Sequence, residues 1–62
     1  MLDSYNERAI RERYAAHWYM YLTQAEDRRI DWAFDNADNR QYDLIQRIGE
    51  RRAIRAYEAS RR

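Results

Sequence analysis

Side chains that could perform catalysis or bind a metal are scarce in this sequence. His17 is the only histidine, and there is no cysteine. The positions three and four residues away from it hold Arg13, Tyr14, Met20 and Tyr21. None of these supplies the second ligand that a zinc site on a helix needs. Ser4 and Ser60 are far apart in sequence, and no glycine-rich phosphate loop is present. We therefore expect no catalytic activity, no metal and no cofactor, and we expect His17 at the edge of a helix interface.

Four aspartates recur at intervals of about one helical turn. They are Asp27, Asp31, Asp35 and Asp38. A calcium-binding loop alternates its ligands and has a glycine at its sixth position, so this spacing does not indicate calcium. The aspartates form either a solvated helix face or an acidic stripe that meets a basic groove on a partner.

Arginines dominate the second half of the chain. All twelve basic residues are arginines, and residues 40–62 carry a net charge of +4, against −3 for residues 1–39. One helix face would present Arg40, Arg47, Arg51, Arg55 and Arg62. These arginines, Arg47, Arg51, Arg55 and Arg62 in particular, could bind phosphate groups. The alternative is that the two oppositely charged halves attract each other, and a net charge of +1 is small for a nucleic-acid-binding protein.

The elements that position these residues are predicted to be helices. Ser4-x-x-Glu7 is typical of a capping box at a helix start. An apolar stripe at helical spacing then runs through Ile10, Tyr14, Trp18, Tyr21, Leu22, Ala25 and Trp32. This stripe predicts one long helix to about residue 34. Thr23-x-x-Glu26 is a second capping box and gives the alternative, a break near Leu22.

A turn is predicted at residues 35–39, where Asp and Asn residues are concentrated. Asp38 would cap a second helix from about Asn39 to Ser60, with Gln41 at its third position. Gly49 lies within this helix and allows three interpretations: a kink, a loop with a third helix from about Glu50, or close approach by another helix.

The fold class predicted is all-α, a helical hairpin within a single domain of residues 1–62. The core is predicted to contain Ile10, Tyr14, Trp18, Tyr21, Ile45 and Ile48. Two helices make a thin core, and a chain of 62 residues without cysteine has no disulfide to support it. We therefore expect dimerisation into a four-helix bundle.

A second apolar patch is predicted on the far side of the first helix. It comprises Tyr5, Ala9, Ala16, Tyr19, Ile30, Phe34 and Ala37. A soluble monomer rarely leaves such a patch unused. The predicted protein interface therefore consists of Tyr19, Met20, Ile30 and Phe34, with Asp27, Asp31 and Asp35 as its polar rim. If the chain instead breaks near Thr23, both patches would belong to one three-helix core.

These features favour an interaction module that binds another protein and modulates or inhibits it, with a homodimer as its expected state. A small accessory protein of a phage or mobile element would have this size and composition. Two alternatives are a nucleic-acid-binding protein that uses the arginine stripe and a structural subunit of a larger assembly. No segment has the 18 or so consecutive apolar residues of a membrane span, and the N-terminus does not resemble a secretory signal, so we expect a cytoplasmic location.

Overall fold

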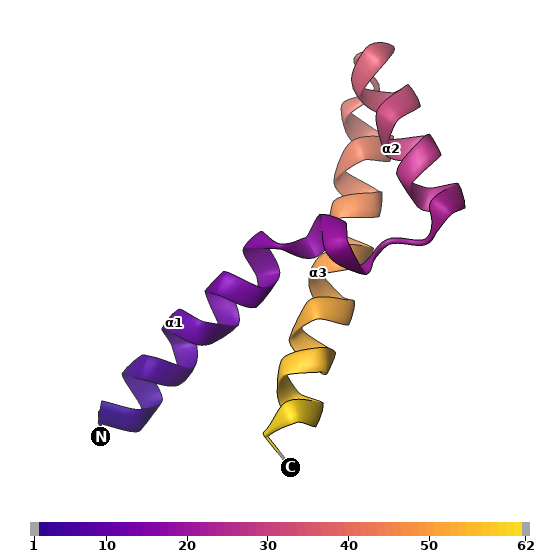
Figure 1. The fold of residues 1–62 in the computed structure, drawn as a ribbon. Coiled ribbons are helices and arrows are strands. Elements are labelled where there is room, and N and C mark those ends of the chain that lie inside the picture. Colours follow the sequence, from indigo (N-terminus) through magenta and orange to yellow (C-terminus); the bar gives the residue numbers. More distant parts are fainter. Residues whose placement is uncertain (1, 62) are drawn as a thin grey trace.

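Residues 2–61 fold into three α-helices and one short 3-10 helix (Figure 1). The structure is a computed structural model that describes the backbone of residues 2–61 and the side chains of residues 6–61. The elements are α1 (Leu2–Ala16), the 3-10 helix η1 (Trp18–Tyr21), α2 (Gln24–Asp35) and α3 (Asn39–Ser60). The all-α fold class is confirmed, and no strand occurs between residues 2 and 61.

The prediction of one continuous helix to residue 34 is wrong. The chain leaves α1 at His17, forms η1, and is extended at Leu22 and Thr23 before α2 begins. The capping box at Thr23 is complete: its hydroxyl accepts from the Glu26 amide at 3.2 Å, and its own amide donates to the Glu26 carboxylate at 2.8 Å. These reciprocal bonds satisfy two amides at the new helix start and so stabilise a helix that begins after Thr23.

The capping box predicted at Ser4 does not mark the start of the first helix. α1 already begins at Leu2, two residues before Ser4, whose side chain lies outside the described residues.

The turn predicted between the last two helices is confirmed. Ala37 adopts a positive φ of 53°, and its amide donates to the Phe34 carbonyl at 3.2 Å. The Asp38 amide donates to the Ala33 carbonyl at 2.8 Å, so the end of α2 is a Schellman motif with alanine in the place that glycine usually takes. The Asp38 carboxylate then accepts from the Gln41 amide at 3.2 Å and caps α3, as predicted.

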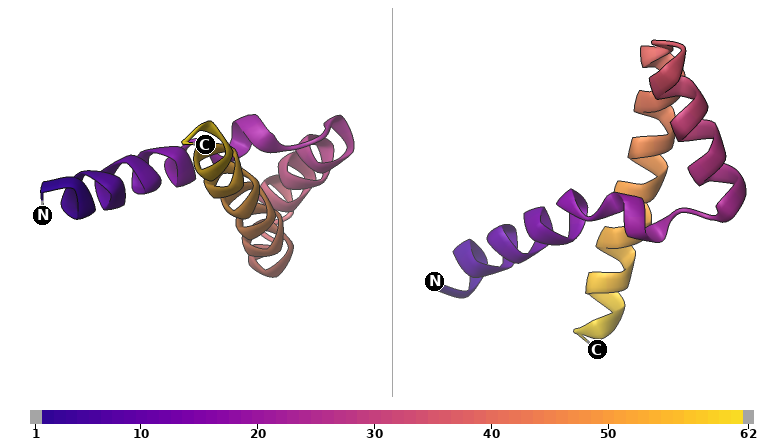
Figure 2. Two further views of the ribbon diagram at one scale, coloured as in Figure 1. Left: turned by 90° about the horizontal axis from the view of Figure 1, so that it is seen from below. Right: turned by 45° about the horizontal axis from the view of Figure 1, so that its top comes forward.

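α3 is the spine against which every other element packs. α2 lies along its N-terminal half, η1 crosses its middle, and α1 approaches its C-terminal half (Figures 1 and 2). Its buried residues recur every four positions: Ile45, Gly49, Ala53 and Tyr57. This spacing keeps one gradually turning stripe of α3 in contact with all three neighbours.

Gly49 is where η1 meets α3. The helix runs through it without a break, so the loop and third helix considered for residues 49 and 50 are wrong. A Cβ atom at Gly49 would lie 2.6 Å from the carbonyl oxygen of Trp18, well inside van der Waals contact. Close approach by another element, the third interpretation, is therefore the correct one.

The core differs from the one predicted. The buried hydrophobic side chains are Ile30, Ala33, Ile45, Ala53 and Tyr57. Of the predicted set only Ile45 is buried; Ile10 and Ile48 are exposed, and the remaining three are half-buried. The break after Ala16 explains why Ile30 and Ala33 join the core, because it rotates residues 24–35 away from the helical phase that residues 2–16 set.

The molecule is elongated. Its radius of gyration is 13.6 Å, where about 11 Å is expected for a compact chain of this length. α1 diverges from α3 in both views of Figure 2. Two ion pairs connect them, Arg11 to Glu58 at 2.9 Å and Arg61 to Glu7.

Candidate protein-binding surfaces

An ion pair fixes η1 and α2 on α3. The Arg52 guanidinium donates to both carboxylate oxygens of Glu26, at 2.5 and 3.0 Å, and to the Tyr21 carbonyl at 3.1 Å. These hydrogen bonds from Arg52, together with the one from the Thr23 amide, lower the pKa of Glu26 from 4.5 to about 2. One arginine thus holds the end of η1 and the start of α2 at a single place on α3.

Four aromatic rings form a continuous row across three elements. The ring centroids of Phe34 and Tyr42 are 6.4 Å apart, those of Tyr42 and Trp18 are 5.9 Å apart, and those of Trp18 and Tyr19 are 6.0 Å apart. The row runs from the last turn of α2 over α3 to η1. Its outer members are open to solvent: the exposed fraction is 74% for Phe34 and 54% for Tyr19.

Acidic side chains flank this row. Asp27 and Asp31 precede Phe34 by seven and three residues, which places all three on one side of α2. Both aspartates are exposed. We call this surface the aromatic–acidic face; it consists of Trp18, Tyr19, Asp27, Asp31, Phe34 and Tyr42.

The structure brings some of the predicted interface residues together and separates others. Tyr19 and Phe34 belong to the aromatic–acidic face. Ile30 does not, because it is only 8% exposed and packs in the core, so its assignment to the interface is wrong. Met20 is 69% exposed but lines a different pocket, and Asp35 is exposed in the last turn of α2.

The position of one residue of the row differs from its prediction. Trp18 is predicted to lie in the core, and it is half-buried, as is Tyr42. Their contact joins residues 24 positions apart and depends on η1 crossing α3. No local spacing in the sequence reveals it.

A second exposed surface combines apolar side chains with arginines. Arg29, Trp32 and Gln41 line a small pocket between α2 and α3. From there one side of α3 presents Gln41, Leu44, Ile48, Arg51 and Arg55, at spacings of three and four residues. Leu44 is 51% exposed and Trp32 is 56% exposed. We call this surface the arginine–apolar face; it consists of Arg29, Trp32, Gln41, Leu44, Ile48, Arg51 and Arg55.

The predicted arginine stripe is only partly retained in this face. Arg51 and Arg55 belong to it, whereas Arg40 and Arg47 are exposed beside it, and Arg47 pairs with Asp43 at 3.2 Å. Arg62 lies outside the described residues. Leu44 was missed, although its spacing from Ile48 and Arg51 was visible in the sequence.

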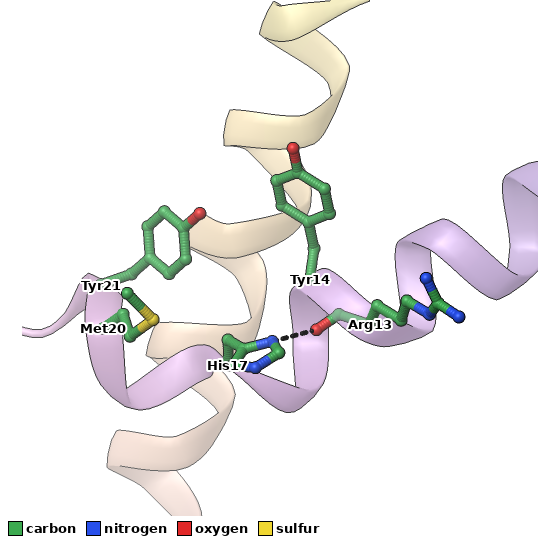
Figure 3. Close-up of a pocket in the computed structure, with 5 residues that line it drawn as sticks. All are labelled: Arg13, Tyr14, His17, Met20 and Tyr21. Atoms are coloured by element: carbon green, nitrogen blue, oxygen red, sulfur yellow. Dashed lines mark hydrogen bonds between the residues drawn. The ribbon is translucent and has the colours of Figure 1, made fainter.

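An open pocket lies beside His17. It has a volume of about 370 Å³ and is lined by Arg13, Tyr14, His17, Met20 and Tyr21. His17 Nδ1 donates to the Arg13 carbonyl at 2.8 Å, and the Arg13 side chain points away from the other residues (Figure 3). The ring of Tyr14 lies 5.2 Å from that of Tyr57 on α3. The polar groups of a catalytic site converge on a common point. Those of this pocket do not.

The described part of the chain contains no group of three His, Cys, Asp or Glu residues that could hold a metal ion. None of its described helices is long and apolar enough to cross a membrane. Comparison of the chain with protein-family models, curated proteins and solved structures finds no match.

Proposed function

We propose that this chain is an interaction module that binds another protein through its aromatic–acidic face and modulates or inhibits that protein. The row of four rings carries the proposal. Aromatic side chains are enriched in protein interfaces, and a few of them usually supply most of the binding free energy. Phe34 and Tyr19 have the exposure that such anchors need before a partner covers them.

The scaffold beneath the row supports this role. The Arg52 ion pair and the contact between Gly49 and Trp18 hold η1 and α2 on α3, so the rings are already positioned before binding. Because little ordering is then required on association, more of the contact free energy appears as affinity.

Charge indicates what kind of partner fits. Asp27 and Asp31 lie beside the aromatic row, so the matching surface is apolar at its centre and basic at its edge. Such rim charges mainly set orientation and association rate.

A photo-cross-linking side chain at Phe34 tests the proposal. The control carries the same group at Arg8, which is exposed on α1, outside both faces. In extracts of the source cells, the Phe34 probe is expected to label a discrete protein that the Arg8 probe does not label. The proposal then requires that the purified partner change its activity when the chain is added. Identical labelling by both probes would contradict it.

Nucleic-acid binding is a second candidate, favoured by one observation. Trp32 is exposed next to Arg29 in a shallow pocket, and Arg51 and Arg55 are exposed on the same face. An exposed ring among arginines suits base stacking and phosphate contacts. Micromolar binding to random DNA that weakens steeply with salt would support it. Leu44 and Ile48 occupy the middle of this face, however, and suit an apolar partner better.

A further inference from the structure

The arginine–apolar face has no role in the protein binding proposed for the aromatic–acidic face. It lies on the opposite side of the α2–α3 pair from the aromatic–acidic face. Phe34 meets Tyr42 on one side, whereas Trp32 and Gln41 line a pocket on the other. Helix geometry agrees, because Trp32 and Phe34 diverge by about 160° on α2, and Gln41 and Tyr42 by about 100° on α3.

The two faces are complementary in charge and alike in apolar character. One side presents Asp27 and Asp31 beside exposed rings. The other presents Arg51 and Arg55 beside Leu44 and Ile48. Each face therefore offers what the other needs: an apolar centre and a rim of the opposite charge.

The exposed area is also large enough for a further contact. The accessible surface of the chain is 5484 Å², whereas a compact protein of 7.7 kDa is expected to expose about 4,300 Å². The excess is larger than the roughly 800 Å² that each partner buries in a typical interface. Because only five hydrophobic residues are buried among those whose side chains are described, the chain gains more than most from such a contact.

We propose that the arginine–apolar face of one copy docks onto the aromatic–acidic face of a second copy. Because the faces lie on opposite sides, the contact is head to tail, and each copy can bind two neighbours. Repetition then produces a ring or an open chain of copies, not a closed two-fold dimer. The inference rests on the proposed function in one respect, that the aromatic–acidic face binds protein, and the partner protein would compete with the second copy for it.

Sedimentation of two variants, alone and mixed, tests this arrangement. Tyr19→Ala with Phe34→Ala removes the anchors of the aromatic–acidic face. Leu44→Ala with Arg51→Ala removes those of the arginine–apolar face. All four residues are exposed, so both variants are expected to keep the circular dichroism of the parent.

The expected result is specific to head-to-tail contact. From about 1 μM to about 1 mM, the parent should grow beyond twice the chain mass, and added salt should weaken its association. Each variant alone should associate at least 30-fold more weakly than the parent. Their equimolar mixture should form a heterodimer with parent-like affinity and stop there, because each variant supplies the one intact face that the other lacks.

Two results would overturn the inference. One is a parent that stays at the chain mass throughout the range. The other is a parent that stops at a dimer while the mixed variants fail to associate, which indicates a two-fold contact. In either case, labelling of a partner from Phe34 leaves the proposed function standing. If the alanine variant of the aromatic row does not fold, Asp27→Asn with Asp31→Asn replaces it, and the readout is then the salt dependence of association, which the loss of these charges should reduce.

Discussion

Gly49 is the residue whose replacement most directly tests the packing of η1 on α3. In an exposed helix, alanine is more favourable than glycine by about 1 kcal/mol. Here the added Cβ would lie 2.6 Å from a backbone oxygen of Trp18, which cannot move without shifting η1. We expect Gly49→Ala to lower the free energy of unfolding by about 1–3 kcal/mol, measured by urea denaturation. An unchanged or raised stability would mean that η1 does not lie against Gly49.

At Ala37, replacement by glycine is expected to stabilise the protein. The positive φ of Ala37 costs an L-residue about 1–2 kcal/mol, and glycine adopts it freely. Ala37→Gly should therefore raise the free energy of unfolding by about 0.5–1 kcal/mol. The matched control is Ala56→Gly inside α3, which should lower it by about 1 kcal/mol. Equal effects of the two substitutions would show that the turn lacks this geometry.

Glu26 makes stability depend on pH. Its pKa is about 2 in the folded protein, because of the hydrogen bonds from Arg52 and Thr23, and 4.5 is its ordinary value. Between these two values the unfolded chain binds more protons, so stability falls as the pH falls. The contribution of Glu26 is complete above about pH 4.5 and is lost as the pH approaches 2.

Glu26→Gln should remove this dependence. Glutamine can still serve in a capping box, so the start of α2 is kept while the charge is lost. In denaturation curves recorded from pH 6 to about pH 2, the parent should be the more stable at pH 6, and the difference should shrink towards pH 2. A constant difference across this range would contradict the role given to the Arg52 ion pair.

At the scale of the elements, local signals in the sequence were more informative than periodicity. The turn at residues 36–38, the Asp38 cap and the Thr23 capping box were all visible as short motifs. The long apolar stripe was misleading, because it continued through Leu22 by coincidence of spacing. Arg52 supports the break together with the Thr23 capping box, because it binds both Glu26 and the Tyr21 carbonyl from a distant part of the chain. No local sequence pattern predicts such a contact.

The surface residues could also be predicted only in part, because helical spacing applies within one element and not across the break near Leu22. Tyr19 and Phe34 were expected to be exposed, and they are. Ile30 was placed beside them by counting along one continuous helix, and the break turns it into the core. The link from Trp18 to Tyr42 requires knowledge of how η1 crosses α3, and sequence spacing does not contain it.

α1 should be the least protected helix. None of its described side chains is buried, and it diverges from α3 towards its start (Figure 1). Its ion pairs to Glu58 and Arg61 are exposed, and such pairs add at most about 1 kcal/mol. Amide hydrogen exchange is expected to be fastest in α1 and slowest near Gly49 and Ala53 in α3. Uniform protection of the three helices would show that α1 packs more extensively than described.

At the scale of the whole molecule, few of the described side chains are buried, and many large apolar side chains are exposed. The described chain measures 45 × 19 × 12 Å along its principal axes, so few residues can lie more than one layer from solvent. Among the described residues, the buried hydrophobic side chains are Ile30 and Ala33 of α2 and those of a narrow stripe on α3, whereas Phe34 and Leu44 lie exposed on the two faces. Such a distribution suits a protein that completes its packing by association.

The affinity of the cross-linked partner for one double variant tests this account most directly. Tyr19→Ala with Phe34→Ala should leave the fold intact, because both side chains are largely exposed, and should weaken partner binding by about 30-fold or more. The matched control, Leu44→Ala with Arg51→Ala, removes an apolar and a basic side chain from the opposite face and should bind the partner like the parent. The affinities of the partner for the parent and for the two double variants are compared by titration calorimetry, at concentrations too low for the chain to self-associate. Equal affinity of the two double variants would contradict the central claim that the aromatic–acidic face is the binding surface.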